Sequence, residues 1–232
     1  MLSAKPKTKV NYSDILPVSR SKKEARESYD RISRFYDYTE GIFEKKSINK
    51  ALKYLNIKEG EIVLEIGFGT GNALIKIAER IGKSGFAHGV DISPKMLERT
   101  NRKINKLGLS DRIKLISRDA IKLPYPDKKF NAVFLSFTLE LFDTPEIPEI
   151  LKEIKRVLKP GGRLGVVSLS KDNGRSIFLR LYEWAHKKFP RSIDCRPIFV
   201  AYSLENAGFD ISYKKKAKIF FAPLEIIVGL NK

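Results

Sequence analysis

Hydrophobic and polar positions follow two different periods along the middle of the chain. From residue 61 to residue 170, short apolar runs alternate with longer segments whose apolar residues recur every three to four positions. The short runs are typical of buried strands, and the longer period is typical of amphipathic helices. We predict strands over residues 62–66, 86–90, 113–116, 132–137 and 164–169. Strands that alternate with helices indicate a mostly parallel sheet covered on both faces.

The helices between these strands have recognisable boundaries. Ser93-Pro94 is a good start for the helix that follows the second strand, because serine caps a helix and proline suits its first turn. The clearest amphipathic pattern spans residues 147–158, and Pro160-Gly161-Gly162 ends it. These boundaries support the alternation of strands and helices.

The two ends of the chain depart from this alternation. Residues 1–20 are polar and basic and predict a loose arm, whereas residues 22–55 have helical spacing. We therefore divide the chain into a basic flexible arm, an N-terminal helical segment and a main domain, at 1–20, 21–57 and 58–232. After the fifth strand we expect helices at 177–189 and 201–207, then strands at 209–213 and 220–230 joined by the basic stretch 214–218.

A glycine-rich turn follows the first predicted strand. Gly67, Gly69 and Gly71 allow a sharp turn and let a ligand lie directly on the backbone. A dinucleotide-binding turn has glycine three positions after Gly69, where this chain has Asn72. Glu65 precedes the turn and would repel a pyrophosphate but attract an ammonium group. The pattern favours a nucleoside that carries an amino acid over a dinucleotide.

Polar residues also follow the next strands, at the carboxyl edge where an open parallel sheet binds ligands. Asp91 ends the second strand and is placed to accept hydrogen bonds from two ribose hydroxyls, although a role in capping the next helix is the alternative. Asp119 follows the third strand and is suited to an adenine amine, while Ser136 ends the fourth. Together they predict one binding rim.

Composition limits the cellular compartments and the classes of partner that fit the chain. Lys and Arg exceed Asp and Glu by 45 − 27 = 18, which suggests an anionic partner or, as the alternative, simple solubility. The chain has one cysteine, Cys195, and two histidines, so a metal site is not expected. The N-terminus does not resemble a secretory signal, and no apolar run approaches the ~20 residues of a membrane helix. We expect a cytoplasmic protein that touches membranes only peripherally.

Taken together, the ordered motifs resemble the class I methyltransferases, which use S-adenosyl-L-methionine. The motifs are 63–71 (VLEIGFGTG), 91–93 (DIS), 119–120 (DA), 123–127 (LPYPD), 130–133 (FNAV) and 157–162 (VLKPGG). Within that class the chain is most similar to the ubiquinone/menaquinone biosynthesis C-methyltransferases, over about residues 25–170. The resemblance implies a Rossmann-like, doubly wound sheet of about seven strands with an antiparallel last strand, and a helical lid over the cofactor.

The same resemblance implies which residues contact the cofactor. Gly67, Gly69 and Gly71 would lie under its methionine part. The remaining expected contacts are in the lid, in the strand ends and in the loops after them: Tyr36, Glu65, Thr70, Asp91, Ile92, Asp119, Ala120 and Ser136. For Tyr36, packing on a helix face is an equal alternative.

The methyl acceptor is less well defined by the sequence. Glu140 follows the fourth strand and is the candidate general base, with a solvated loop acid as the alternative. An apolar and aromatic segment at 177–189 favours a small-molecule or lipid- and quinone-like acceptor, and the basic charge favours docking on an anionic membrane. Methylation of RNA and a catalytically silent, cofactor-binding subunit remain the alternative functions.

Overall fold

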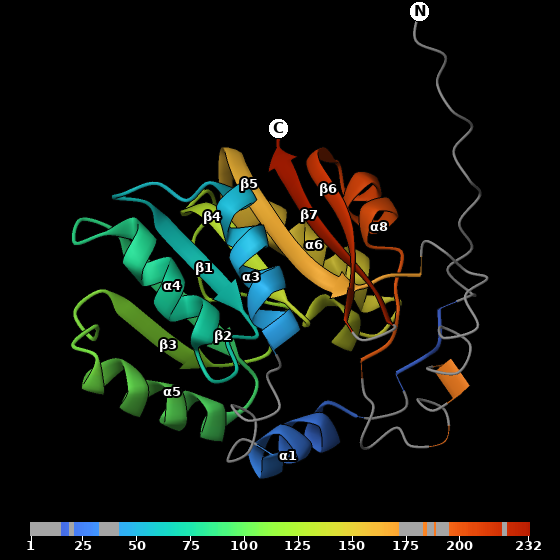
Figure 1. Cartoon of the computed structure of the whole chain (residues 1–232), viewed down its shortest axis with the longest axis horizontal. Helices are drawn as coiled ribbons and strands as arrows, with labels where there is room; N and C mark the ends of the chain where they lie inside the picture. The colour runs from blue at the N-terminus through green and yellow to red at the C-terminus, as the bar shows by residue number, and fades with distance from the viewer. Residues whose placement is uncertain are drawn as a thin grey trace, which may run out of the picture.

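A seven-stranded sheet forms the centre of the protein, in the order β3-β2-β1-β4-β5-β7-β6 (Figure 1). The computed structural model describes residues 15–18, 21–32, 42–171, 183–184, 188, 195–219 and 222–232. The strands are β1 (Ile62–Ile66), β2 (Phe86–Asp91), β3 (Ile113–Ser117), β4 (Phe130–Ser136), β5 (Leu158–Leu169), β6 (Phe209–Ile219) and β7 (Ala222–Asn231). The pairs from β3 to β5 are parallel, and β7 is antiparallel to both of its neighbours. This confirms the predicted fold class.

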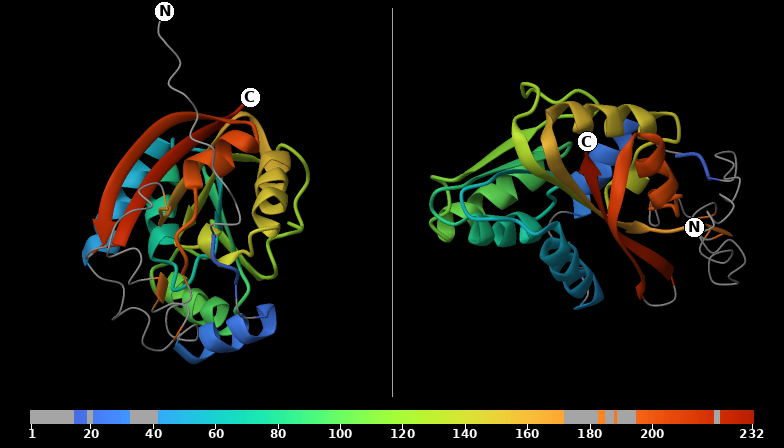
Figure 2. Two further views of the ribbon diagram at one scale, coloured as in Figure 1. Left: turned by 90° about the vertical axis from the view of Figure 1, so that its right-hand side faces the viewer. Right: turned by 90° about the horizontal axis from the view of Figure 1, so that it is seen from above.

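Helices cover both faces of the sheet (Figure 2). The helices α3 (Ile42–Leu55), α4 (Asn72–Ile81) and α5 (Pro94–Lys106) contribute to one core cluster. The helices α6 (Glu146–Val157) and α8 (Val200–Asn206) contribute to the cluster on the opposite face. Helix α1 (Lys22–Ile32) lies outside these two layers, at the end of the sheet where the parallel strands finish (Figure 1).

The central strands β1 and β4 are apolar on both faces because both faces are covered by helices. Val63 and its neighbour Leu64 are fully buried and pack in opposite clusters. The chain runs from β1 outward to β3 and then returns to β4, so the direction of winding changes between β1 and β4. A change of this kind opens a crevice at the carboxyl ends of the two strands, where open α/β sheets bind their ligands.

Two N-terminal segments pack more closely than a loose arm and a separate lid would suggest. Ile15 is buried in the core cluster on the α6 side, so the described residues 15–18 do not form the loose arm that we predicted for 1–20. Leu52 and Leu55 of α3 are buried against the sheet, and this helix is part of the main core. The domain boundaries at residues 20 and 57 stay predictions.

The C-terminal strands differ in one respect from the prediction. The basic stretch 214–218 does not connect two strands but lies within β6, which continues to Ile219. In this edge strand alternate side chains face opposite sides, so Tyr213 can stack on Tyr54 of α3 with ring centroids 3.6 Å apart while lysines remain exposed. The helix expected at 177–189 falls largely outside the described residues.

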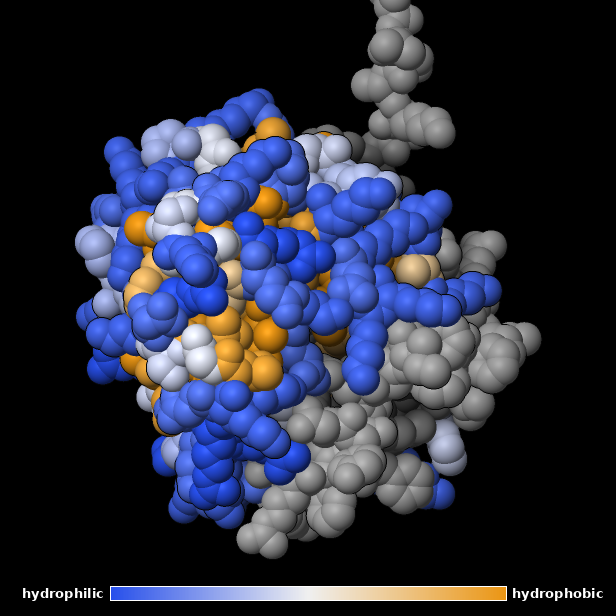
Figure 3. Space-filling model, turned by 60° about the vertical axis from the view of Figure 1, so that its left-hand side comes forward, coloured by the Kyte–Doolittle hydropathy of each residue, from blue (hydrophilic) through white to orange (hydrophobic). Residues whose placement is uncertain are grey.

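Hydrophilic residues cover most of the described part of the face shown in Figure 3, and hydrophobic residues are visible between them. Within the part of the chain that the structure describes, no helix has both the length and the apolar character needed to cross a membrane.

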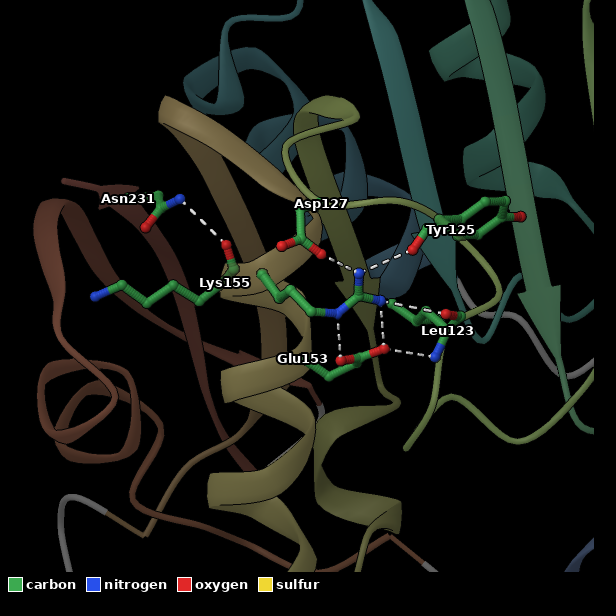
Figure 4. A network of polar contacts seen from close by, with 7 residues as sticks. Leu123, Tyr125, Asp127, Glu153, Lys155 and Asn231 are labelled. Carbon is green, nitrogen blue, oxygen red and sulfur yellow. Dashed lines mark hydrogen bonds and ion pairs between the residues drawn. The ribbon is translucent and has the colours of Figure 1, made fainter.

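Arg156 of α6 fixes the connection between β3 and β4 (Figure 4). Its guanidinium pairs with both carboxylate oxygens of Glu153, at 2.8 and 2.7 Å, and with Asp127 at 2.6 Å. It also donates to the carbonyl oxygens of Leu123 and Tyr125. Glu153 in turn accepts from the backbone N–H of Leu123 at 2.7 Å. The paired charges lower the pKa of Glu153. The loop that begins with Asp119 is thereby held to α6.

We expect Arg156→Met to lower the free energy of unfolding by about 2 kcal/mol, because it leaves Glu153 and two backbone carbonyls without their charged partner. For a chain of this size the loss corresponds to a fall of roughly 4–8 °C in Tm, measurable by calorimetry. Lys152→Met, at an exposed position of the same helix, is the matched control. Equal Tm values for the two variants would contradict the role of Arg156.

The burial of His88 predicts that the stability of the protein depends on pH. His88 is buried in β2, and the centroid of its ring lies 5.1 Å from that of Tyr125 and 5.4 Å from that of Phe130. Burial, together with Lys129 and Lys114, lowers its pKa to about 4. The unfolded chain binds this proton more tightly than the folded chain does. The contribution of His88 to the free energy of unfolding is therefore fully present above pH 6.5 and is lost as the pH falls toward 4.

We expect His88→Phe to remove about 1–2 kcal/mol of the stability difference between pH 7 and pH 5, since phenylalanine has no proton to bind. Urea unfolding of both proteins at the two pH values measures the difference. An identical pH dependence in wild type and variant would show that His88 is not neutral and buried in the folded state.

Candidate active site

The glycine turn predicted after the first strand lies between β1 and α4. The Gly67 N–H donates to the carbonyl oxygen of Val90 at 2.7 Å, which fixes the start of the turn to β2. Gly67 and Gly71 have φ values of 73° and 77°, in the left-handed region that favours glycine. A Cβ atom at Gly67 would lie 2.3 Å from Oγ1 of Thr138. The sequence therefore needs glycine here so that β1 and β4 can approach across the turn.

Asp91, at the end of β2, holds this turn in place. Its Oδ2 accepts from the N–H of Gly69 at 2.8 Å, and its Oδ1 accepts from the N–H of Ser93 at 2.9 Å. Ser93 is the N-cap of α5 and accepts from the N–H of Met96. Burial raises the pKa of Asp91 against the lowering effect of these hydrogen bonds. Asp91 therefore joins the glycine turn to the beginning of α5 and also faces the cavity described next.

A cavity of about 410 Å³ opens at the carboxyl ends of β1, β2 and β4. A size in this range is typical of small-molecule sites. Seven of the residues predicted from the sequence line it: Gly67, Gly69, Asp91, Ile92, Asp119, Ala120 and Ser136. The structure thus brings together residues from four separate loops and strand ends, as the parallel topology predicts.

Glu65 and Thr70 line a smaller hollow on the other side of the turn, of about 40 Å³. Gly67, Gly69 and Ser136 border both spaces, so the two are adjacent. Glu65 is almost completely buried, as its place in a central strand requires. The Oγ of Ser136 is buried and has no hydrogen-bond partner among the described residues. A hydroxyl without a partner at the junction of two hollows is a natural contact for a polar ligand.

Sequence reasoning missed part of the cavity lining. This part lies just before and at the beginning of α6 and consists of Leu141, Phe142, Asp143 and Glu146. The N–H of Asp143 donates to Oε2 of Glu146 at 3.1 Å, which is half of a capping box. The signal that could have indicated it is an acid followed three residues later by glutamate, directly before the clearest amphipathic helix in the chain.

Charge in the cavity is unbalanced. The acidic residues that line it are Asp91, Asp119, Asp143 and Glu146, and the basic ones are Lys22 and Arg118. Four carboxylates against two cations leave an excess of negative charge. Such a site favours a cationic ligand, since opposite charges attract strongly where water is partly excluded.

Glu140 is not where the sequence suggested. It belongs to the short 3-10 helix η2 (Leu139–Leu141), is fully buried, and is not among the residues that line the cavity. Its Oε1 accepts from the N–H of Leu169 at 3.2 Å. Burial lowers the pKa of Arg196, which is also fully buried, and Glu140 is one of the nearby carboxylates that oppose this shift. Glu140 therefore supports the end of β5 and does not face the cavity. Tyr36 lies outside the described residues.

Comparisons with known proteins agree with this geometry. The family described as "Methyltransferase domain" matches residues 63–162, from β1 to the beginning of β5. A demethylmenaquinone methyltransferase of Lactobacillus johnsonii is 34% identical over 172 residues, covering 72% of this chain and 69% of the relative. A second, of Symbiobacterium thermophilum, is 31% identical over 210 residues, or 83% of each chain.

Among solved structures, a SAM-dependent methyltransferase from Aquifex aeolicus superposes with a TM-score of 0.61 at 23% identity, covering 80% of this chain and 89% of its own. At that identity the likeness concerns the fold alone, and the assignment of an activity rests on the relatives found by sequence. The glycine turn, the acids at the strand ends and these relatives lead to one assignment: the chain belongs to the S-adenosylmethionine-dependent class I methyltransferases related to those of quinone biosynthesis.

Proposed function

We propose that this methyltransferase transfers the methyl group of S-adenosylmethionine to a small, quinone-like acceptor. The observation that carries the proposal is the lining of the cavity, which combines carboxylates with apolar side chains such as Leu141 and Phe142. A charged cofactor suits the carboxylates, and a flat apolar ring suits the apolar side chains. The relatives named demethylmenaquinone methyltransferases support an acceptor of this class.

The residues present fit the cofactor. The glycine turn offers a floor without side chains, and the unpartnered hydroxyl of Ser136 is available to a polar group. We assign the methionine part to this turn and to Glu65, the ribose to Asp91, and the adenine to Asp119 and Ala120. Further contacts come from residues around the turn and from the strand ends: Thr70, Ile92 and Ser136.

The cofactor, when bound, supplies an activated methyl group on a positively charged sulfur. The chain contributes binding, alignment and exclusion of water, which are the protein's usual share in such reactions. Asp91 is well suited to orientation, because its carboxylate is already fixed by two backbone N–H groups and loses little freedom on binding. The excess of carboxylates favours the charged cofactor over its neutral product, which helps the product to leave.

We expect Asp91→Ala to weaken cofactor binding by about 2 kcal/mol, or roughly 30-fold in Kd, because two hydrogen bonds to a charged group are lost. Isothermal titration with S-adenosylhomocysteine measures it. Asp111→Ala, at an exposed acid before β3, is the matched control and should bind normally. Thermal unfolding checks that the variants are folded. Wild-type affinity in a folded Asp91→Ala protein would show that Asp91 serves only the turn and α5.

The acceptor can be identified by transfer of a labelled methyl group into a cell extract that is then separated into lipid, RNA, protein and small-molecule fractions. We expect label in the lipid fraction, and then in a purified demethylated quinone in its reduced form. As a control, Asp91→Ala protein at the same concentration should transfer much less. Label mainly in RNA would replace the proposed acceptor with a nucleic acid, and label in no fraction would favour a catalytically silent subunit.

A further inference from the structure

A lysine in helix α1 bridges two sides of the cavity, and the following inference about it rests on the proposed function. The Nζ of Lys22 lies 2.7 Å from Oδ2 of Asp119 and 2.5 Å from Oε1 of Glu146. Asp119 follows β3, and Glu146 is the first residue of α6. All three residues line the cavity. One ammonium group therefore links the loop after β3 to the first turn of α6.

The other end of α1 is also held by polar contacts. Asp30 accepts from the Ser93 hydroxyl at 2.5 Å and from the Lys95 N–H at 3.2 Å, both at the start of α5. Lys22 and Asp30 are eight residues apart, so about 12 Å of helix lies between the two attachments. The cavity is lined by α1 at Lys22 and Ala25. The helix thus borders the cavity and is attached near both of its own ends.

The polar contacts that hold α1 are partly exposed to solvent. None of the α1 side chains whose burial is described is buried, and Lys22 and Asp119 are 47% and 38% exposed. Burial opposes the charge on Lys22, but the two carboxylates outweigh it and raise the pKa of the ammonium group. Ion pairs at this exposure are weak and are screened by salt. The ion pairs of Lys22 are therefore contacts that can break and form again easily.

We propose that Lys22 is a positioning residue that fastens α1 over the bound cofactor and so controls how fast cofactor and product are exchanged. Asp119, to which we assign the adenine, is one of its two partners, so the occupied site and the closed helix share a carboxylate. Oδ1 of Asp119 already accepts from the N–H of Ile121, which keeps the carboxylate in place while both groups bind it. Glu146 supplies the second attachment, outside the assigned cofactor contacts.

The test compares Lys22→Met with Lys23→Met, a change at the next residue of the same helix, which is also exposed. Stopped-flow displacement gives the rate at which S-adenosylhomocysteine dissociates. We expect S-adenosylhomocysteine to dissociate about 5–10 times faster from Lys22→Met than from the wild-type protein at low salt. We expect Lys23→Met to behave as wild type and Lys22→Arg to restore most of the slow rate. Raising the salt concentration to about 0.5 M should increase the dissociation rate from the wild-type protein toward that from Lys22→Met, because screening weakens the ion pairs.

Hydrogen exchange of the α1 amides in the ligand-free protein is a second measurement that does not depend on the proposed function. Exchange should be faster in Lys22→Met than in Lys23→Met, with unchanged protection in α4. If dissociation and exchange are the same in the two variants, the proposal for Lys22 is wrong. If wild type fails to bind the ligand while exchange still separates the variants, the assignment of the cavity fails and the attachment of α1 by Lys22 stands.

Discussion

The hydrogen bonds that Asp91 accepts from Gly69 and Ser93 are the contacts on which the binding edge depends. One carboxylate binds the turn at Gly69 and also places the first residues of α5. It acts together with the hydrogen bond from Gly67 to Val90 and with the hydroxyl of Thr100, which donates to the carbonyl oxygen of Gly69 at 2.8 Å. Because glycine restricts the backbone least, contacts of this kind keep the turn in one conformation. The cavity therefore depends on an acid that positions two backbone segments against each other.

The sequence predicted this part of the molecule well because its determinants are local. Gly67 and Gly71 have conformations that few other residues adopt, and Asp91 follows a strand whose apolar run is easily recognised. The parallel topology then brings these residues to one edge without any long-range detail being known. For the same reason the strands β1 to β4 fall close to their predicted positions, and the core residues of α6 follow its periodicity. Strand β5 ends at Leu169 as predicted but begins at Leu158, six residues before its predicted start.

The residues that the sequence did not place depend on contacts across long distances in the chain. Lys22 meets Asp119 from 97 residues away, and nothing in either segment indicates the other. Glu140 follows the fourth strand, as a base facing the cavity would. Its carboxylate is buried in the interior, where it accepts a hydrogen bond from the N–H of Leu169 in β5. The lysines of β6 resemble a loop by composition. Their strand exists because Val228, Ile227 and Ile226 of β7 offer a continuous partner.

That lysine-rich strand has a consequence for the protein at high concentration. β6 is the last strand of the sheet, and an open edge of this kind can pair with the same edge of another molecule. Lys214, Lys215, Lys216 and Lys218 follow one another closely along it. Two such edges in contact would bring these ammonium groups together, and their repulsion would oppose the pairing of the backbones. A lysine-rich edge strand is a common means by which proteins discourage edge-to-edge aggregation.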